Sequence, residues 1–513
     1  MRGPHNIWRL IRTGATFERS GAMGAVLLAL DAPPQLRLAA KLLGWPFKWL
    51  GLRGDPALPP VTRALSALGP AYIKFGQTLA TRPDIVGEEL AGQLKYLQDK
   101  LPPFGQAEAR AAIEADLGRP LADMFDEFSQ PVAAASIAQV HRARLRATGA
   151  DVAVKVLRPG IERAFRRDVD AFYFAARTIE VLAPFARRLR PTEVIAHFES
   201  VVMAELDLRL EAAAASEFAE NTKNDAGFSV PLPVWDYSGR RVMTLAWVNS
   251  PSMSDSAAVD ALIDAGIVDR TELGARVLQL FLSHALRDGL FHGDMHQGNL
   301  KVAANGDIIA LDFGIMGRID AYTRRVYAEI LMGFMQRNYR RVAEVHFEAG
   351  YVPADRDIDE FALALRAVGE PIFGMDATRL SMSRLLGHLF EVTERFGMET
   401  RTELILLQRT MVVVEGVARS LDPAINIWHV ARPVVEDYVR KNVGPAALLR
   451  DIAQAAQVMA RFGPRLPRLI EGALIASGDK TKAPEPRRTR AYAWAALALV
   501  GGIGFGYGLA IFI

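Results

Sequence analysis

Residues 291–314, FHGDMHQGNLKVAANGDIIALDFG, contain three side chains at short spacings that can supply oxygen ligands, those of Asp294, Asn299 and Asp312. Asn299 follows Asp294 by five residues, and Asp312 follows Asn299 by thirteen. A carboxylate and an amide carbonyl are hard ligands that Mg²⁺ accepts beside phosphate groups. A separate carboxylate near a transferring phosphoryl group can orient a hydroxyl or a water. The stretch therefore predicts magnesium-dependent phosphate chemistry, with Asp294 as the catalytic residue and Asn299 and Asp312 as metal ligands.

The same positions fit the protein-kinase pattern H-R-D-x-x-x-x-N followed by D-F-G. D-F-G alone is a weak signal, but together with H-G-D and a correctly spaced Asn it is a strong one. An acidic turn before a buried strand would explain only the D-F-G. His292 and His296 have the spacing of zinc ligands on a helix. However, the Glu of H-E-x-x-H is missing, and Gly293 and Gly298 interrupt a helix.

An upstream lysine completes the expected ATP site. VAVKV, residues 152–156, places Lys155 in the middle of a predicted strand. A lysine buried there is costly unless it is paired. In kinases this lysine binds the α- and β-phosphates of ATP and pairs with a helix glutamate, and LDLRLEAAAASEF offers Glu211. The alternative is an edge-strand lysine directed to water, which the downstream motif disfavours. The expected cofactors are ATP and Mg²⁺.

The segment PVAAASIAQV stands where kinases place glycines over the phosphates. Alanine permits a fairly close approach, but it does not favour the positive φ angles that glycine adopts. We therefore expect a stiffer loop that holds the nucleotide differently. The residues expected to bind the nucleotide in this loop and the hinge are Val132, Ala133, Ala134, Ala135, Ser136, Ile137, Ala138, Gln139, Val140, Trp247 and Val248.

Apolar periodicity indicates the elements that position these residues. Helix-period patterns run through 61–128, in VTRALSALG, AYIKFGQTLATRPD, EELAGQLKYLQDK and EARAAIEADLG. SIAQVHRARLR and VAVKVLRP predict two strands joined by a hairpin, and SVPLPVWDYSGRRVMTLAWV predicts two more around Ser238-Gly239. A long helix is expected over about 192–221, and mostly helix after Ser254.

We predict an α+β chain with an atypical two-lobed protein-kinase-like fold, an N-terminal helical extension and a C-terminal transmembrane helix. The expected parts are a helical, membrane-proximal region (1–60), the helical extension (61–130), the kinase-like N-lobe (131–250), the kinase-like C-lobe (251–470), a basic linker (471–490) and the transmembrane helix (491–513).

Composition narrows the classes of function. The 513 residues exceed one ordinary core, so more than one folded unit is expected. The absence of cysteine excludes disulfides, thiolate metal sites and cysteine nucleophiles. A net charge of +3 is no nucleic-acid signature, so no nucleic-acid partner is expected.

The two ends differ in their membrane signals. AYAWAALALVGGIGFGYGLAIFI, residues 491–513, is uncharged and long enough to span a bilayer, and the basic linker before it should stay cytoplasmic. A buried C-terminal helix is the alternative. Two overlapping GxxxG spacings permit a homo-oligomer through this helix. At the N-terminus, GAMGAVLLAL is no convincing signal peptide, and LAAKLLGWPFKWLGLRG fits either a membrane interface or internal packing.

Together these residues resemble the UbiB family, atypical kinase-like proteins tied to ubiquinone biosynthesis. The resemblance runs from about Leu68 to beyond Gly317 and includes the alanine-rich loop, VAVKV and HGDMHQGN…DFG. Two further motifs match, K-x-G-Q in LGPAYIKFGQTLATRPDIV as Lys74, Gly76 and Gln77, and E-x-D in MAELDLRLEA as Glu205 and Asp207. K-x-G-Q and the alanine-rich loop are specific, because ordinary kinases have neither.

Three features depart from the family. Gln297 stands where Pro is usual, Ser250 stands in the hinge where Gly is common, and one membrane span is evident where some relatives have two. The first departure loosens the turn of the catalytic loop but keeps its ligands.

The resemblance implies a helical extension that folds over the kinase active site. Lys74 and Gln77 are three residues apart and share a helix face, which in the family approaches the E-x-D residues. A solvated lysine is the alternative for Lys74, but its apolar neighbours Tyr72, Ile73 and Phe75 favour a packed helix. The family implies a cell inner-membrane protein with a cytoplasmic catalytic domain. Its implied partners are membrane lipids, enzymes of ubiquinone biosynthesis and quinone intermediates.

Three functions compete. The first is a membrane-anchored, magnesium-dependent ATPase that gives biosynthetic enzymes access to quinone intermediates. The second is a phosphotransferase acting on a lipid, a small molecule or a protein. The third is a nucleotide-gated scaffold, which the retained base and metal ligands disfavour.

Overall fold

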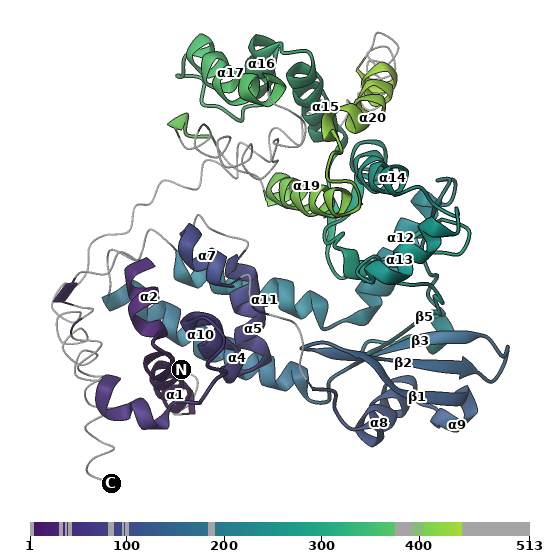
Figure 1. The fold of residues 1–513 in the computed structure, drawn as a ribbon. Coiled ribbons are helices and arrows are strands. Elements are labelled where there is room, and N and C mark those ends of the chain that lie inside the picture. Colours follow the sequence, from purple (N-terminus) through teal and green to yellow (C-terminus); the bar gives the residue numbers. More distant parts are fainter. Residues whose placement is uncertain are drawn as a thin grey trace, which may run out of the picture. The chain divides into compact units, whose positions relative to one another are not determined.

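The computed structural model describes residues 5–29, 34–35, 38, 44–80, 87–94, 97, 102–182, 190–374, 392, 395–398 and 402–443. The described chain forms two compact units (Figure 1). The first contains the residues up to Leu210 together with Val234–Trp247. The second contains Glu211–Pro233 and the residues from Val248 onward.

The first unit begins with the helices of residues 5–124, which lie in the regions expected at 1–60 and 61–130. These are α1 (His5–Ser20), α2 (Ala22–Ala29), η1 (Trp45–Leu50), α4 (Pro60–Leu68), α5 (Pro70–Ala80) and α7 (Glu88–Leu94), with α8 (Gln106–Leu117) and the short α9 (Leu121–Met124) following. The four helix-period patterns of 61–128 are confirmed as α4, α5, α7 and α8. In η1, the side chain of Trp49 is 73% exposed.

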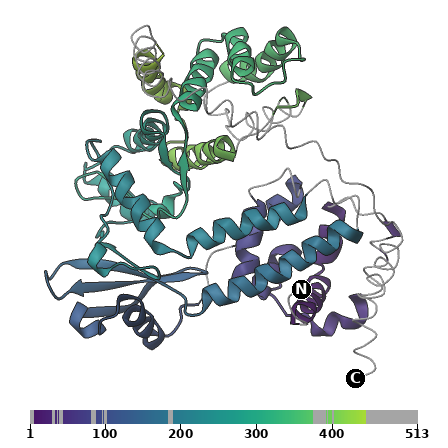
Figure 2. The same ribbon diagram turned by 180° about the vertical axis from the view of Figure 1, so that it is seen from behind.

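Two long helices, α10 (Ile161–Leu182) and α11 (Pro191–Glu205), pack against α5 in this unit (Figure 2). Aromatic rings make the contact. The ring centroid of Phe172 on α10 lies 4.8 Å from that of Tyr72 and 5.1 Å from that of Phe75. Phe198 on α11 lies 5.2 Å from Phe75. The prediction that the helix carrying Lys74 is packed is confirmed.

A four-stranded antiparallel sheet completes the first unit. Its strands are β1 (Phe125–Ala134), β2 (Ala138–Leu145), β3 (Asp151–Leu157) and β5 (Val242–Ala246), in the order β1-β2-β3-β5. The predicted hairpin of β2 and β3 is confirmed, and Gly149 takes the positive φ of 69° in its turn. The core face packs against α8, where Ile113 and the alternate residues Val152, Val154 and Val156 are buried.

The observed strands differ from the predicted ones at two places. Residues 125–134 form β1, where no strand was predicted, and they pair along β2. Of the two strands expected around Ser238-Gly239, only β5 joins this sheet. The segment before it forms the 3₁₀ turn η3 (Trp235–Tyr237), since Ser238 Oγ donates to the Val234 carbonyl at 2.9 Å. The short β4 (Phe228–Ser229) pairs instead with β8 in the second unit.

The single helix expected over 192–221 is two helices, α11 and α12 (Leu208–Thr222). Asp207 lies at the break. Its Oδ1 accepts the backbone N–H of Arg209 at 3.2 Å, as a residue at a helix start does. Arg209 also donates from its guanidinium, which lowers the pKa of Asp207. Because the Asp207 carboxylate bonds to the backbone of the first turn of α12, α11 ends before Asp207 and α12 begins after it.

The second unit is mostly helical, as expected after Ser254. Its helices and turns are α13 (Ser256–Asp264), α14 (Arg270–Ser283), the π-helical turn η4 (His284–Asp288), η5 (Gln297–Asn299), α15 (Ala321–Met335), α16 (Tyr339–Glu348), α17 (Ile358–Gly374), α19 (Thr402–Leu421) and α20 (Ile427–Asn442). The starts of α13, α14, α15, α16 and α20 are capped by Asp or Asn side chains that accept a backbone N–H.

Short strands carry the catalytic stretch of this unit. β6 (Leu290–His292) pairs with β9 (Met316–Arg318), and β7 (Leu300–Val302) pairs with β8 (Ile308–Ala310). A single apolar core lies beneath them, and Phe281, Phe291 and Phe313 are almost completely buried in it. Helices α14 and α19 lie side by side (Figure 1) and cover this core.

The membrane helix expected at 491–513 and the basic linker before it lie outside the described residues. Among the helices that the structure does describe, none combines the length and the apolar character needed to cross a bilayer.

Candidate functional site

The candidate catalytic loop of the second unit runs from β6 through η5 to β7. His292 ends β6, is fully buried and holds both sides of the loop. Its Nε2 lies 2.9 Å from the Leu311 carbonyl, and its Nδ1 accepts the backbone N–H of Asp294 at 3.0 Å. Because Nδ1 accepts, the proton of the neutral ring is on Nε2. Burial lowers the pKa of His292, which favours this neutral form.

Asp294 and Asn299 are brought together by this loop. Asn299 Nδ2 donates to the backbone carbonyl of Asp294 at 3.0 Å, and the Asn299 carbonyl accepts the N–H of Leu311 at 2.8 Å. The amide donor is thereby used inside the loop, so Oδ1 is the atom of this side chain that can meet a cation. The Asp294 side chain is 36% exposed and can reach a substrate.

Asp312 opens the D-F-G tripeptide in a left-handed backbone conformation, with a φ of 61°. Aspartate adopts this region more readily than most residues. The turn buries Phe313 and leaves Asp312 exposed. The Asp312 carboxylate and the Asn299 carbonyl oxygen are hard donors of the kind that Mg²⁺ requires, so the residues present fit that ion.

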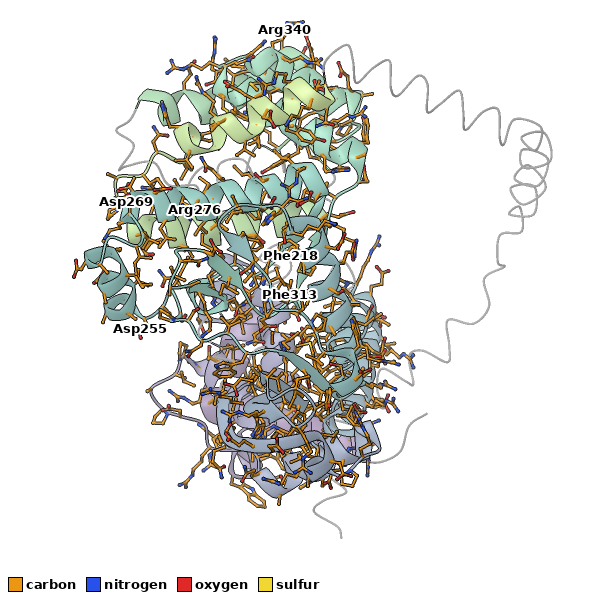
Figure 3. The ribbon with its side chains drawn as sticks, turned by 90° about the vertical axis from the view of Figure 1, so that its right-hand side faces the viewer. Phe218, Asp255, Asp269, Arg276, Phe313 and Arg340 are labelled. Carbon is orange, nitrogen blue, oxygen red and sulfur yellow. The ribbon has the colours of Figure 1, made fainter. Side chains whose placement is uncertain are left out.

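Phe313 links D-F-G to the helix that carries Glu211. Its ring centroid lies 5.5 Å from that of His292 and 5.9 Å from that of Phe218 on α12 (Figure 3). Glu211 lies in the first turn of α12 and is only 8% exposed. A buried carboxylate requires a polar or cationic partner. The expected partner, Lys155, belongs to the first unit, so that pairing stays a prediction.

The zinc alternative is inconsistent with the two histidines. Both ring nitrogens of His292 are within hydrogen-bonding distance of backbone groups, so neither can bind a metal. His296 Nδ1 accepts the N–H of Gly298 at 2.9 Å, which shapes the turn before Asn299. These histidines hold the loop together.

Lys155 lies on β3, which is an interior strand between β2 and β5. The alternative of an edge-strand lysine is therefore wrong. The register places Lys155 opposite Val140 on one side and Met243 on the other. The valines on either side of it along β3 are buried in the core, so the half-buried Lys155 lies on the other face of the sheet.

The alanine-rich loop forms without any left-handed residue, since none of residues 131–140 has a positive φ. This agrees with the expectation that alanines replace the special conformations of glycine. Ala135 N–H donates to the Ala138 carbonyl at 2.8 Å and closes the turn. Ser136 is fully buried, and its Oγ has no hydrogen-bond partner among the residues that the structure describes.

Gln139, expected at the nucleotide, is buried and 1% exposed, and its nucleotide-binding role stays a prediction. Its Oε1 accepts the N–H of Phe104 at 2.9 Å, and its Nε2 donates to the Phe104 carbonyl at 3.3 Å. Nε2 also lies 2.9 Å from His141 Nε2, and His141 Nδ1 lies 2.8 Å from the Ser129 carbonyl. The side chain of Gln139 thus ties the strand after the loop to the segment before α8.

The hinge residue Trp247 ends the first unit next to β3. Its N–H donates to the Asp151 carbonyl at 3.1 Å, and Arg142 stacks 5.2 Å from its ring. Its indole Nε1 is buried and has no hydrogen-bond partner in the described part of the chain. Val248 begins the next part of the second unit. The nucleotide-binding roles of both residues stay predictions.

The K-x-G-Q and E-x-D motifs meet within the first unit. Lys74 Nζ lies 3.0 Å from Glu205 Oε2, and both side chains are mostly buried, at 16% and 15% exposure. The solvated-lysine alternative is therefore wrong. Gln77 Nε2 donates to the Leu97 carbonyl at 3.4 Å. The carboxylate of Asp207, two residues after Glu205, forms a salt bridge with the guanidinium of Arg209.

Sequence reasoning missed two groups that hold these sites. Thr410 on α19 donates to the Gly293 carbonyl at 3.0 Å, although the two residues are far apart in the chain. His141 on β2 supports Gln139. The segment QVH offered His141 as a polar residue inside a strand, whereas no local pattern identified Thr410.

Comparisons with known proteins agree with this geometry. Residues 96–346 match the ABC1 atypical kinase-like domain, and residues 365–426 match the UbiB helical domain. A probable protein kinase UbiB from Marinobacter nauticus is 39% identical over 417 residues, or 80% of this chain and 75% of that protein. The protein of the same name from Vibrio cholerae serotype O1 is 39% identical over 443 residues, or 85% and 80% of the two chains.

Among solved structures, that of Rv3197 from Mycobacterium tuberculosis, a complex with erythromycin, is similar with a TM-score of 0.50. The two sequences are 25% identical, and the similar region covers 70% of this chain and 90% of the Rv3197 chain. The kinase-like fold, with helices and small sheets, is confirmed. The chain belongs to the UbiB family of atypical kinase-like proteins.

Proposed function

We propose that the chain is a membrane-anchored, Mg²⁺- and ATP-dependent atypical kinase-like ATPase that supports ubiquinone biosynthesis. The observation that carries the proposal is the bond from Asn299 Nδ2 to the Asp294 carbonyl, at 3.0 Å. It fixes an amide oxygen beside a carboxylate on a loop that also leads to D-F-G. A carboxylate, an amide and a second aspartate at these spacings are what phosphoryl transfer requires.

Each residue has a distinct role in this proposal. Asn299 and Asp312 would hold Mg²⁺, which neutralises the charge of the transferring phosphoryl group. Asp294 would orient the attacking water. Lys155 would contact the α- and β-phosphates beside the loop of residues 132–140, and Glu211 would hold its ammonium group. Trp247 and Val248 would contact the base.

The cellular role follows from membership of the family. Curated relatives carry the name probable protein kinase UbiB, which implies a role in ubiquinone biosynthesis. We propose that residues 491–513 anchor the chain in the inner membrane, with the catalytic part in the cytoplasm. Hydrolysis would then give biosynthetic enzymes access to quinone intermediates in the lipid, and the GxxxG spacings of the anchor would permit a homo-oligomer.

The decisive experiment measures ATP turnover by the full chain in anionic liposomes. Asp294→Asn should lower turnover by about 100-fold or more, the usual range for a general base, while Asp312→Asn should abolish it. Asp307→Asn is a matched control in the same unit, because the side chain of Asp307 bonds only to Asn305 in the described hydrogen bonds. It should leave turnover unchanged.

The products separate the alternatives. Release of inorganic phosphate supports the ATPase, whereas stoichiometric transfer of labelled phosphate to a lipid, a small molecule or a protein supports the phosphotransferase. Nucleotide binding without any turnover would refute both, and restoration of quinone content by the Asp294→Asn, Asp312→Asn double variant would establish a scaffold.

A further inference from the structure

A threonine on α19 contacts the backbone of the catalytic loop. Thr410 is completely buried, and its Oγ1 lies 2.8 Å from the Leu406 carbonyl and 3.0 Å from the Gly293 carbonyl. A threonine inside a helix ordinarily bonds only to the carbonyl four residues earlier. Here a single hydroxyl hydrogen lies between two acceptors, and the second acceptor belongs to the peptide that leads into Asp294.

This peptide unit is held at both of its polar groups. Its carbonyl, from Gly293, accepts from Thr410, and its N–H, from Asp294, donates to His292 Nδ1 at 3.0 Å. A peptide is planar, so fixing both groups fixes the plane. The N–Cα bond of Asp294, from which its side chain projects, is thereby held by α19 on one side and by His292 on the other.

The surroundings leave little room for the loop to move. A Cβ placed on Gly293 would lie 2.8 Å from Ile315 Cγ2 and 3.3 Å from Leu406 Cδ1. The Gly293 N–H also donates to the Ile315 carbonyl at 2.8 Å. The loop is therefore enclosed between the chain after D-F-G and the apolar side of α19.

The same helix meets the loop at a second point. The amide of Gln297 donates to Ser420 Oγ, and Ser420 Oγ in turn donates to the Val417 carbonyl at 2.6 Å. The Gln297 carbonyl accepts from Ser252 Oγ at 3.0 Å. The side chain of Gln297 therefore attaches the turn of this loop to α19.

We propose that α19, which lies in the match to the UbiB helical domain, positions the catalytic carboxylate through Thr410, with Gln297 and Ser420 as a second attachment. Thr410 is a positioning residue, since it acts on Asp294 through the Gly293 peptide. The inference rests on the proposed role of Asp294. It assigns the helical domain a part in turnover that is separate from nucleotide binding.

The test compares Thr410→Val, which keeps the shape and removes the hydroxyl, with Thr410→Ser, which keeps the hydroxyl. Loss of one neutral hydrogen bond corresponds to a reduction of about three- to tenfold in kcat. We expect Thr410→Val of the full chain to show it, with the affinity for Mg-ATP changed less than about twofold. Thr410→Ser should retain wild-type kcat.

Hydrogen exchange of peptides covering residues 291–299 supplies a readout that does not depend on activity. Exchange there should be faster in Thr410→Val and unchanged in Thr410→Ser. Thr222→Val is the matched control, because its buried hydroxyl bonds only to the Phe218 carbonyl in the described hydrogen bonds. It should alter neither kcat nor the exchange of this loop.

The outcomes separate this inference from the proposed function. If Asp294→Asn keeps wild-type turnover, Asp294 is not the catalytic residue, and the inference about Thr410 is wrong as well. If Asp294→Asn is inactive while Thr410→Val keeps wild-type kcat and exchange, the positioning role alone is wrong. Equal losses in the Val and Ser variants, or a parallel loss of nucleotide affinity, would mark Thr410 as a packing residue.

Discussion

Gly76 of K-x-G-Q allows α5 to approach its neighbours closely, so adding one methyl group at this position tests the packing. A Cβ at Gly76 would lie 2.3 Å from Leu97 Cδ1, 2.6 Å from Leu65 Cδ1 and 3.4 Å from Leu94 Cδ2. All three leucines are at most 6% exposed, so they have little space into which to retreat. Gly76→Ala should therefore force α5 away from them.

Two effects of opposite sign set the magnitude. Overpacking of a core costs about 1–3 kcal/mol, whereas replacing glycine by alanine within a helix stabilises it by about 0.5–1 kcal/mol. The overlaps at Gly76 are severe, so the first effect exceeds the second. We expect a net loss of about 1–2 kcal/mol in the local stability of α5, with the contact between Lys74 and Glu205 loosened.

The assay must report on α5 alone, because a chain with two compact units need not unfold in one step. Native-state hydrogen exchange of peptides covering residues 70–80 gives the local opening free energy. Leu97→Val removes the nearest obstructing atom. The loss in the Gly76→Ala, Leu97→Val double variant should therefore fall short of the sum of the single losses by about 1 kcal/mol.

Two results would refute this reasoning. One is a Gly76→Ala variant whose α5 exchanges as slowly as in the wild type or more slowly. The other is strict additivity with Leu97→Val, because it would mean that the new methyl group does not meet Leu97.

Two further predictions concern stability in the second unit. Gly416 lies within α19, and outside the adjoining helix backbone no described atom lies within 4 Å of an added Cβ. Gly416→Ala should therefore stabilise peptides of α19 by about 0.5–1 kcal/mol in hydrogen exchange, and a loss would contradict this. Burial lowers the pKa of His346 to about 4, although its Nδ1 donates to the Val342 carbonyl. Between pH 6.5 and 4 the unfolded chain therefore binds a proton that the folded chain does not, and stability falls as the pH falls. From pH 7 to pH 5 the wild type should lose about 2 kcal/mol relative to His346→Leu in denaturant unfolding, and equal losses would show that His346 titrates normally.

Local spacing accounted for the parts of the site that lie on contiguous chain. The hairpin of β2 and β3 and the loop from His292 to Asn299 depend on alternation and on turn residues, which a short window of sequence contains. Helix α10 was overlooked, although Phe165, Val169 and Phe172 are buried at helical spacing. The helical spacing of these apolar residues is visible in the sequence, so α10 could have been predicted.

Other features depend on tertiary contacts that no window contains. The contact of Lys74 with Glu205 required the packing of α5 against α11, and only the resemblance suggested it beforehand. The break at Asp207 depends on a side chain that competes with helical backbone bonds. Apolar periodicity alone continues through such a residue, which is why one long helix was predicted.

Two observations agree with the prediction that the alanine-rich loop of residues 131–140 is stiff. None of its residues adopts a positive φ, so it lacks the special conformations that a glycine-rich loop can adopt. In addition, two hydrogen bonds join Gln139, on the strand β2 that follows the loop, to Phe104 in the segment before α8. A displacement of that segment must stretch these bonds or move Gln139, which is part of β2. The helical extension therefore contacts the rest of the first unit at two points. Phe104 is hydrogen-bonded to Gln139 beside the alanine-rich loop, and Lys74 contacts Glu205 on α11.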